Sequence, residues 1–227
     1  MARLTGSVLG NLRGKLGNLS ARTVEGKTIL SARPSSFTVS QTPESIEARK
    51  RFGITGNFSK FLMENPDLVS IWTKEKYPGM SVFNTIFKSN YPYTSPDRPT
   101  EDNIITPGGF GLPVTTATLA SDNLTLELGA LDSVAIFSPE EVDLSIAAVV
   151  VYHNPINPED NPYRVIKLSK AESGFDFSAV YNGTLPLDVV QQSIAAKYQD
   201  NILYLAVASK SAEGNVVQYS ATFTQQS

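Results

Sequence analysis

The stretch Ser145–Tyr152, "SIAAVVVY", is an uninterrupted run of small, aliphatic and aromatic residues, and Asn201–Ser209, "NILYLAVAS", repeats the pattern. Both runs are rich in residues that favour strands, and both have the usual length of a strand. We therefore predict that Ile146–Tyr152 and Ile202–Ala208 form the central strands of a sheet.

Five shorter segments of strand-forming residues surround these two runs, and turn-forming residues bound them. They are Val114–Ala120, Leu124–Leu128, Tyr163–Ser169, Gly174–Tyr181 and Asn215–Phe223. Seven strands over roughly 115 residues are typical of an immunoglobulin-like sandwich, which we place at 112–227. Within it, 185–198 holds either a helical turn or a strand that crosses between sheets. Strands and helices do not alternate, which argues against a Rossmann-type or barrel enzyme.

Residues 41–90 are predicted to form a small helical module. A capping residue followed by proline occurs at Thr42-Pro43 and again at Asn65-Pro66, and each pair is typical of a helix start. Apolar residues at helical spacing indicate a third helix within 79–90.

The first of these helices is predicted over 43–62. Gly53 and Gly56 weaken it, so two shorter helices are the alternative. The side chains expected to face an apolar neighbour are Ile46, Phe52, Phe58 and Phe61 or Leu62.

Residues 91–113 contain five prolines and three glycines, a composition typical of a linker or a long surface loop. We therefore predict four parts: an arm (1–40), the helical module (41–90), a linker (91–111) and the sandwich (112–227). The fold class is α+β and mainly β.

The arm begins with residues 4–16, "LTGSVLGNLRGKL", in which aliphatic residues and glycines alternate at every second position. In an extended chain these positions share one face, and the glycines let another backbone approach closely. A short docked helix is the alternative, at about 1 kcal/mol for each interior glycine. A hairpin is predicted at 20–32, around Glu25-Gly26. The predicted assembly face comprises Leu4, Gly6, Val8, Gly10, Leu12, Gly14 and Leu16, with the basic residues Arg13, Lys15, Arg22 and Arg33.

No catalytic or cofactor signature is present. The chain has no cysteine and one histidine, which excludes disulfides, thiol chemistry and a multi-histidine zinc site. Neither the arm nor "PGGFG" (107–111) has the spacing of a nucleotide-binding loop. His153 is expected to be a loop histidine without a catalytic role. Two acidic groups lack the spacing of a calcium loop and are expected to be solvated surface: Glu140, Glu141 and Asp143, and Glu159 and Asp160.

The sequence contains no membrane-spanning segment, because no run approaches the roughly 18 apolar residues that a membrane helix needs. The N-terminal stretch is also too interrupted by polar residues for a general secretory signal, so we expect synthesis in the cytoplasm.

Charge is distributed unevenly along the chain. Residues 1–53 hold nine Lys/Arg and three Asp/Glu, whereas 111–227 hold five and thirteen. One interpretation is that the basic arm and the acidic body attract each other, within one chain or between neighbouring chains. The alternative is that the charges only keep two surfaces soluble. Nucleic acid is not an expected partner, because no aromatic residue precedes Phe37 to stack on bases.

The segment 6–34, "GSVLGNLRGKLGNLSARTVEGKTILSARP", resembles the N-terminal signature of an uncharacterised bacterial family found in Bacteroidota. That family shows a G-x-x-G…G-K-[VL]-G-N arm, a short hairpin and an R-x-x-F helix, matched here by Arg49 and Phe52. Its usual glutamine four residues before the arginine is replaced by Ser45. The resemblance implies the same architecture, with an Ig-like region after the helices, and it implies no activity.

We therefore expect a non-enzymatic structural subunit that forms homo-oligomers through its arm. A contact between a basic arm and an acidic body is heterologous, so it generates a ring or a filament, as in a virion, a tail-like particle or an extracellular filament. The alternative is an Ig-like adhesion module that binds a protein or glycan and folds the arm back on its own chain.

Overall fold

The computed structural model describes residues 13–227 except residues 25, 33, 35 and 37, and the chain divides into two units, 1–46 and 47–227. The first unit contains a three-stranded sheet, and the second, called the body below, contains helices and two sheets. The helices are α1 (Pro43–Leu62), α2 (Pro66–Lys74), α3 (Val82–Asn90) and α4 (Val189–Ala195), with a 3-10 turn at Leu131–Ser133. The N-terminal strands are β1 (Gly14–Leu16), β2 (Leu19–Val24) and β3 (Lys27–Ala32). The body strands are β4 (Val114–Leu119), β5 (Asn123–Leu128), β6 (Glu141–Pro155), β7 (Tyr163–Glu172), β8 (Tyr181–Pro186), β9 (Tyr198–Ser211), β10 (Val216–Tyr219) and β11 (Phe223–Gln226).

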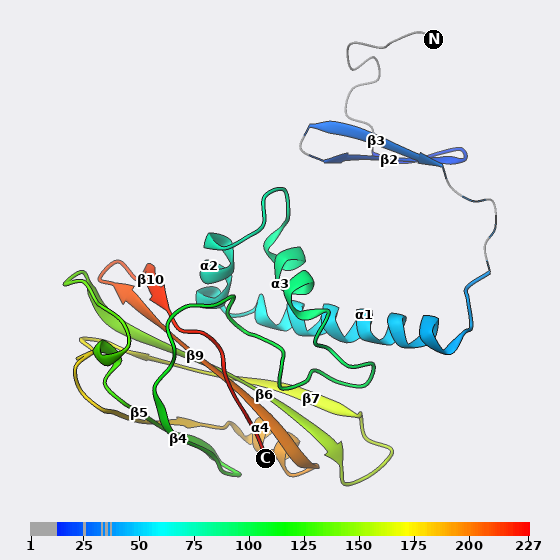
Figure 1. Cartoon of the computed structure of the whole chain (residues 1–227). Helices are drawn as coiled ribbons and strands as arrows, with labels where there is room; N and C mark the ends of the chain where they lie inside the picture. Colours follow the sequence, from blue (N-terminus) through cyan, green and yellow to red (C-terminus); the bar gives the residue numbers. More distant parts are fainter. Residues whose placement is uncertain (1–12, 25, 33, 35, 37) are drawn as a thin grey trace. The chain divides into compact units, whose positions relative to one another are not determined.

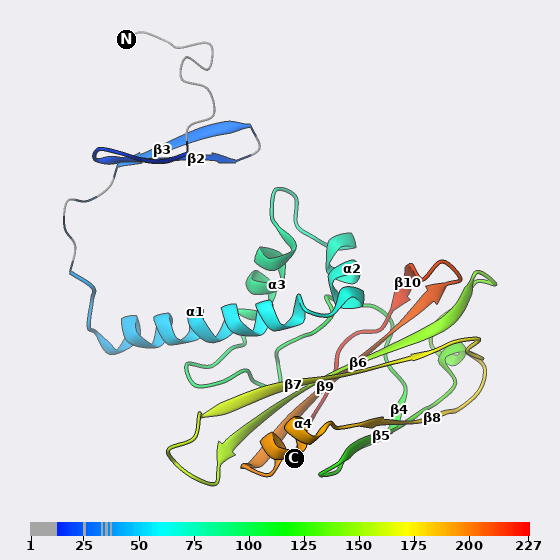
Figure 2. The same cartoon turned by 180° about the vertical axis from the view of Figure 1, so that it is seen from behind.

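The body is built in three layers (Figure 1), and the view from behind shows the same order (Figure 2). The middle layer is an antiparallel sheet in the order β10-β9-β6-β7, with β11 also paired to β9. Helices α1, α2 and α3 cover one face, and the three-stranded sheet β4-β5-β8 covers the other. The predicted central strands are confirmed, because β6 and β9 lie side by side inside the middle layer.

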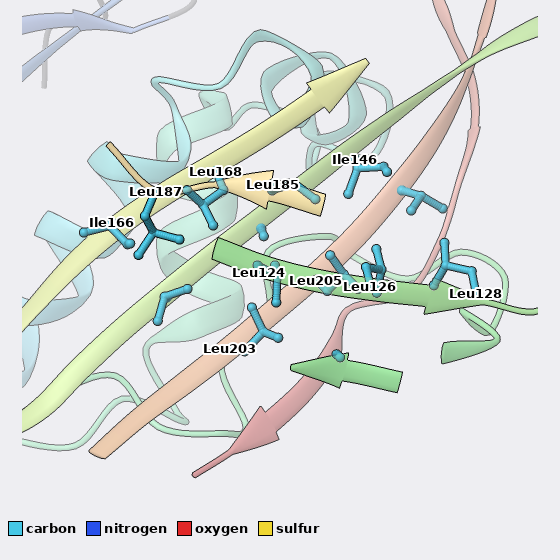
Figure 3. Packing of buried hydrophobic residues seen from close by; sticks show 14 of the residues in the cluster. Leu124, Leu126, Leu128, Ile146, Ile166, Leu168, Leu185, Leu187, Leu203 and Leu205 are labelled. Atoms are coloured by element: carbon cyan, nitrogen blue, oxygen red, sulfur yellow. The ribbon is translucent and has the colours of Figure 1, made fainter. Parts of the chain in front are cut away.

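Alternate side chains of β6 and β9 face two separate cores. Even-numbered residues from Ile146 to Val150 face the three-stranded sheet, together with Leu203 and Leu205 of β9 (Figure 3). Odd-numbered residues from Ala147 to Val151 face the helices. A strand that is covered on both faces needs apolar residues at every position, which explains the uninterrupted apolar runs in β6 and β9. Burial of each aliphatic side chain stabilises the fold by about 1.5–3 kcal/mol.

The α+β, mainly β fold class is confirmed, whereas the immunoglobulin-like topology is not. The two body sheets face each other, but helices cover the second face of the larger sheet. An immunoglobulin-like sandwich has no such helical layer. The strand predicted at Gly174–Tyr181 is wrong except for Tyr181, which begins β8. The backbone N–H and the hydroxyl of Ser178 both donate hydrogen bonds to Asp176 Oδ1, so the segment forms a turn there.

The segment 91–111 is a long loop without a helix or strand, which agrees with one of the two predictions for it, but it packs on the helices and the domain boundary predicted there is wrong. Asn90, itself fully buried, accepts a hydrogen bond from the N–H of Ile104 (2.8 Å) and donates one to the carbonyl of Ile104 (3.1 Å). Trp72 Nε1 donates to the carbonyl of Ile105 at 2.8 Å. These bonds tie the segment to the helices, and the division of the chain lies instead at residues 46 and 47.

Helix α1 is continuous, so the alternative of two shorter helices is wrong. Phe58 and Leu62 are buried as predicted, each 1% exposed. Ile46 and Phe52 were expected to face inward, but they are 36% and 62% exposed. The buried positions of α1 begin only at Thr55, so the first half of the helix contributes little to the core. The caps predicted at Asn65 and Pro66 are confirmed.

Candidate functional site

The N-terminal sheet is the described part of the predicted arm. Strand β2 pairs with β1 on one side and with β3 on the other, both antiparallel. The hairpin predicted at 20–32 is confirmed as β2 and β3, and Gly26 adopts φ 76° in its turn. A left-handed backbone of this kind favours glycine, which explains the Glu-Gly pair at the turn.

The register gives this sheet two chemically different faces, because residues opposite each other in an antiparallel pair share a face. Leu19, Ala21 and Leu30 lie on one face, since Ala21 pairs with Leu30 and Leu19 with Ala32. Lys15 and Arg22 lie on the other face, because Lys15 pairs with Ser20, two residues before Arg22. One face is therefore aliphatic, called the apolar face below, and the other is basic.

The described residues bury little apolar surface on the apolar face. Ala21 is the only buried hydrophobic side chain among those that the structure describes in residues 13–42. Leu30 is 50% exposed, and Ile29 on the opposite face is 38% exposed. A small sheet without a packed face is marginally stable in water, so it gains stability only by covering this face.

The predicted assembly residues fall partly within the described chain. Gly14 and Leu16 lie in β1, and Arg13, Lys15 and Arg22 have exposed side chains in or beside the sheet. The extended conformation is confirmed for residues 14–16. The remaining predicted residues lie outside the described ones: Leu4, Gly6, Val8, Gly10, Leu12 and Arg33.

The charge difference follows the division into two units. Residues 1–46 hold six Lys/Arg and two Asp/Glu, whereas the body holds thirteen and twenty. The first unit therefore carries a net positive charge and the body a net negative charge, and opposite charges attract most strongly at low ionic strength.

His153 is a strand residue, so the expectation of a loop histidine is wrong. It lies in β6, pairs with Tyr163 of β7 and Asp200 of β9, and is 5% exposed. Burial, reinforced by the positive charge of Arg98, lowers its pKa, while the carboxylates of Asp200 and Glu101 oppose the shift. Its Nδ1 lies 3.8 Å from Asp200 Oδ2, and its Nε2 has no hydrogen-bond partner in the described chain.

The surroundings of His153 do not form a hydrolytic triad. The described residues that line the adjacent hollow of about 410 Å³ include Asp97, Arg98 and Asn154 but no serine or threonine. Nucleophilic catalysis needs a hydroxyl or thiol within hydrogen-bond reach of the base. This geometry therefore favours a structural role for the histidine.

Glu141 is buried rather than solvated, which corrects the prediction for the first acidic group. It is 6% exposed and accepts hydrogen bonds from the N–H of Ser138 (2.8 Å), from Gln218 Nε2 (3.0 Å) and from the hydroxyl of Ser209. Burial raises its pKa, but these hydrogen bonds outweigh burial and lower it overall. In the described part of the chain, no three Asp, Glu or His side chains lie close enough together to hold a metal ion.

Comparisons with known protein families, with curated proteins and with solved structures give no match. The resemblance to the Bacteroidota family therefore stays a prediction. No helix among the residues that the structure describes is both long and apolar enough to cross a membrane.

Proposed function

We propose that this protein is a structural subunit that assembles with further copies of itself through its N-terminal arm. The observation that carries the proposal is the apolar face of the N-terminal sheet: among its described side chains Leu30 is half exposed and only Ala21 is buried. A strand-forming segment with this pattern needs a second surface, and strand or sheet addition to a neighbouring chain supplies one.

The opposite net charges of the two units support contact between different parts of two copies. Such a contact is heterologous: each copy offers one surface and uses another, so the assembly grows into a ring or a filament. An arm that instead paired with the same arm of a second copy would bring like charges together, which disfavours a closed symmetric dimer.

The test compares the full-length protein with a variant that lacks residues 1–40. Light scattering and negative-stain microscopy are expected to show ordered oligomers whose size rises with concentration for the full-length chain, and monomers for the truncated chain. A full-length variant with Leu19→Ser and Leu30→Ser removes the apolar face and keeps every charge, so it separates apolar contact from charge attraction.

Circular dichroism of each variant serves as the control for folding of the body. If the full-length chain stays monomeric at every concentration, the proposal fails, and the alternative of an adhesion module that binds a protein or glycan takes its place.

A further inference from the structure

One end of the body sandwich combines an aromatic hollow with unpaired negative charge. This acidic end, defined as the loops 129–140 and 173–180, borders a shallow, open hollow of about 500 Å³. Phe137, Phe175 and Phe177 line it, and Asp132 and Asp176 stand at its rim. The ring centroids of Phe137 and Phe177 are 4.2 Å apart, and those of Phe175 and Phe177 are 5.0 Å apart, so the three rings form one packed cluster.

Ile136 projects from the rim of this hollow and is 93% exposed, more than any other large hydrophobic residue in the described chain. Its position is fixed, because Gln218 Nε2 donates a 2.8 Å hydrogen bond to the carbonyl of Ile136 and also binds the buried Glu141. Glu141 in turn accepts the N–H of Ser138 at 2.8 Å. An exposed isoleucine on a loop held in this way is preorganised for contact, which lowers the entropic cost of binding.

The acidic end has no basic residue of its own. Residues 111–163 contain eight Asp/Glu and no Lys or Arg. The nearest lysines along the strands are already engaged, since Lys170 pairs with Glu172 and Lys210 with Asp67. Asp132 and Glu140 are exposed and take part in no ion pair among the described residues, so their charge is available to a partner.

The opposite end of β6 offers a comparable apolar hollow with a different charge. That hollow measures about 540 Å³ and presents Val189, which is 81% exposed, but Arg164 and Lys197 line it beside a single carboxylate, Asp160. A basic partner is therefore favoured at the acidic end and disfavoured at the opposite end. The two ends are roughly 45 Å apart along the strand, at about 3.3 Å per residue.

We infer that the acidic end is the docking site for the N-terminal sheet of a second copy, whose apolar face covers Ile136 and the phenylalanine-lined hollow. The inference rests on the proposed function and names the receiving surface for it. Two properties of the occupant match the site: its apolar face carries the half-exposed Leu30 beside the partly buried Leu19, and its unit has the opposite net charge.

Two pairs of full-length variants test the site by sedimentation velocity. Ile136→Ser is expected to weaken self-association, whereas Val189→Ser at the opposite end is expected to leave it unchanged. Asp132→Lys with Glu140→Lys is expected to weaken self-association by more than about tenfold, because the changed end then repels the positively charged N-terminal unit. Asp97→Lys with Glu159→Lys makes the same charge change far from the site and is the matched control.

A charge exchange then tests whether the two surfaces meet. Leu30→Asp places a carboxylate on the docking face, so it is expected to weaken self-association alone and to restore it when combined with Asp132→Lys and Glu140→Lys. If deletion of residues 1–40 abolishes assembly but neither the acidic-end variants nor the exchange has an effect, the docking site is overturned and the proposed function stands. If the wild-type chain does not associate at all, the proposed function itself fails.

Discussion

The strands β3 and β9 contain similar residues but have opposite surroundings. In β3, Ile29 and Leu30 are 38% and 50% exposed, whereas Leu203 and Leu205 of β9 are 2% and 0% exposed. Strand propensity is satisfied in both, so propensity alone does not distinguish a strand that completes a core from one that lacks a cover. The difference lies in the layers: β9 has a helical layer on one face and a sheet on the other, while β3 has neither among the described contacts of its unit.

The largest difference between the two strands is expected in the free energy of unfolding when one leucine in each strand is replaced by alanine. Leu205→Ala is expected to lower the free energy of unfolding by about 2–5 kcal/mol, because it leaves a cavity between two sheets. Leu30→Ala is expected to change it by less than about 0.5 kcal/mol, as at most exposed positions. Urea unfolding at low protein concentration, followed by the fluorescence of Trp72, measures both. Equal losses would show that the N-terminal sheet has a core of its own.

A pair of glycines tests how closely the body is packed. A Cβ added at Gly109 would lie 2.1 Å from the carbonyl oxygen of Tyr219, and Gly109 has φ +108°, whereas a Cβ at Gly111 meets nothing within 4 Å. We expect Gly109→Ala to destabilise the body by about 2–4 kcal/mol, through backbone strain and overpacking. Gly111→Ala is the control and is expected to be near neutral.

In the N-terminal sheet, Gly26 also has a positive φ but no neighbour within 4 Å of its Cβ position. Gly26→Ala therefore causes backbone strain in the turn but no steric clash. Thermal unfolding of the body is expected to be unaffected. If Gly109→Ala also left the thermal unfolding of the body unchanged, that result would contradict the close approach of Gly109 to the backbone of Tyr219.

The pH dependence of stability is expected to arise partly from His153, which lies in the body. Because its pKa is lowered in the folded state from 6.5, the unfolded chain binds a proton first as the pH falls. The free energy of unfolding should therefore decrease from pH 6.5 down to the lowered pKa, and stay level above pH 7. His153→Gln should remove this slope in urea unfolding at pH 7.5 and 5.5, whereas deletion of residues 1–40 should keep it.

The smallest effect is expected from that deletion itself. Since the described residues of the arm bury one hydrophobic side chain, removing 1–40 should leave the urea midpoint of the monomeric body nearly unchanged. A clear loss of stability in the monomer would show instead that the arm packs on its own body.

The central strands and the helix starts were predictable because each has a local signal: a continuous apolar run in β6 and β9, and a cap followed by proline at α2. The ordered segment 91–111 was not predictable. Its proline and glycine content resembles a linker, while the groups that fix it are the buried amides of Asn90 and Asn103, which form hydrogen bonds at 3.0–3.1 Å with each other and with the nearby backbone.

The predictions for Glu141 and His153 were wrong for the same reason, because polar residues are usually expected at the surface. Both lie in β6, where His153 pairs with β7 and β9 and Glu141 pairs with β9, and only the folded structure shows that both side chains are buried. For the candidate site, the sequence indicated the basic arm, and Gly14 and Leu16 proved extended. The acidic end was not predicted, because Ile136, Phe137 and Phe175 come together only when two distant loops meet.

The placement of β9 has a consequence for synthesis on the ribosome. The helical layer surrounds Trp72, yet its partners in the middle sheet include Tyr204 and Ala206, which follow about 130 residues later in the chain. At about 5–20 residues per second, β9 is synthesised roughly 7 to 26 seconds after the apolar surface of α1 and α2 that it covers. During that interval the nascent chain exposes an apolar helical surface. We therefore expect chaperone binding to residues 55–72 to be strongest before β9 emerges from the ribosome.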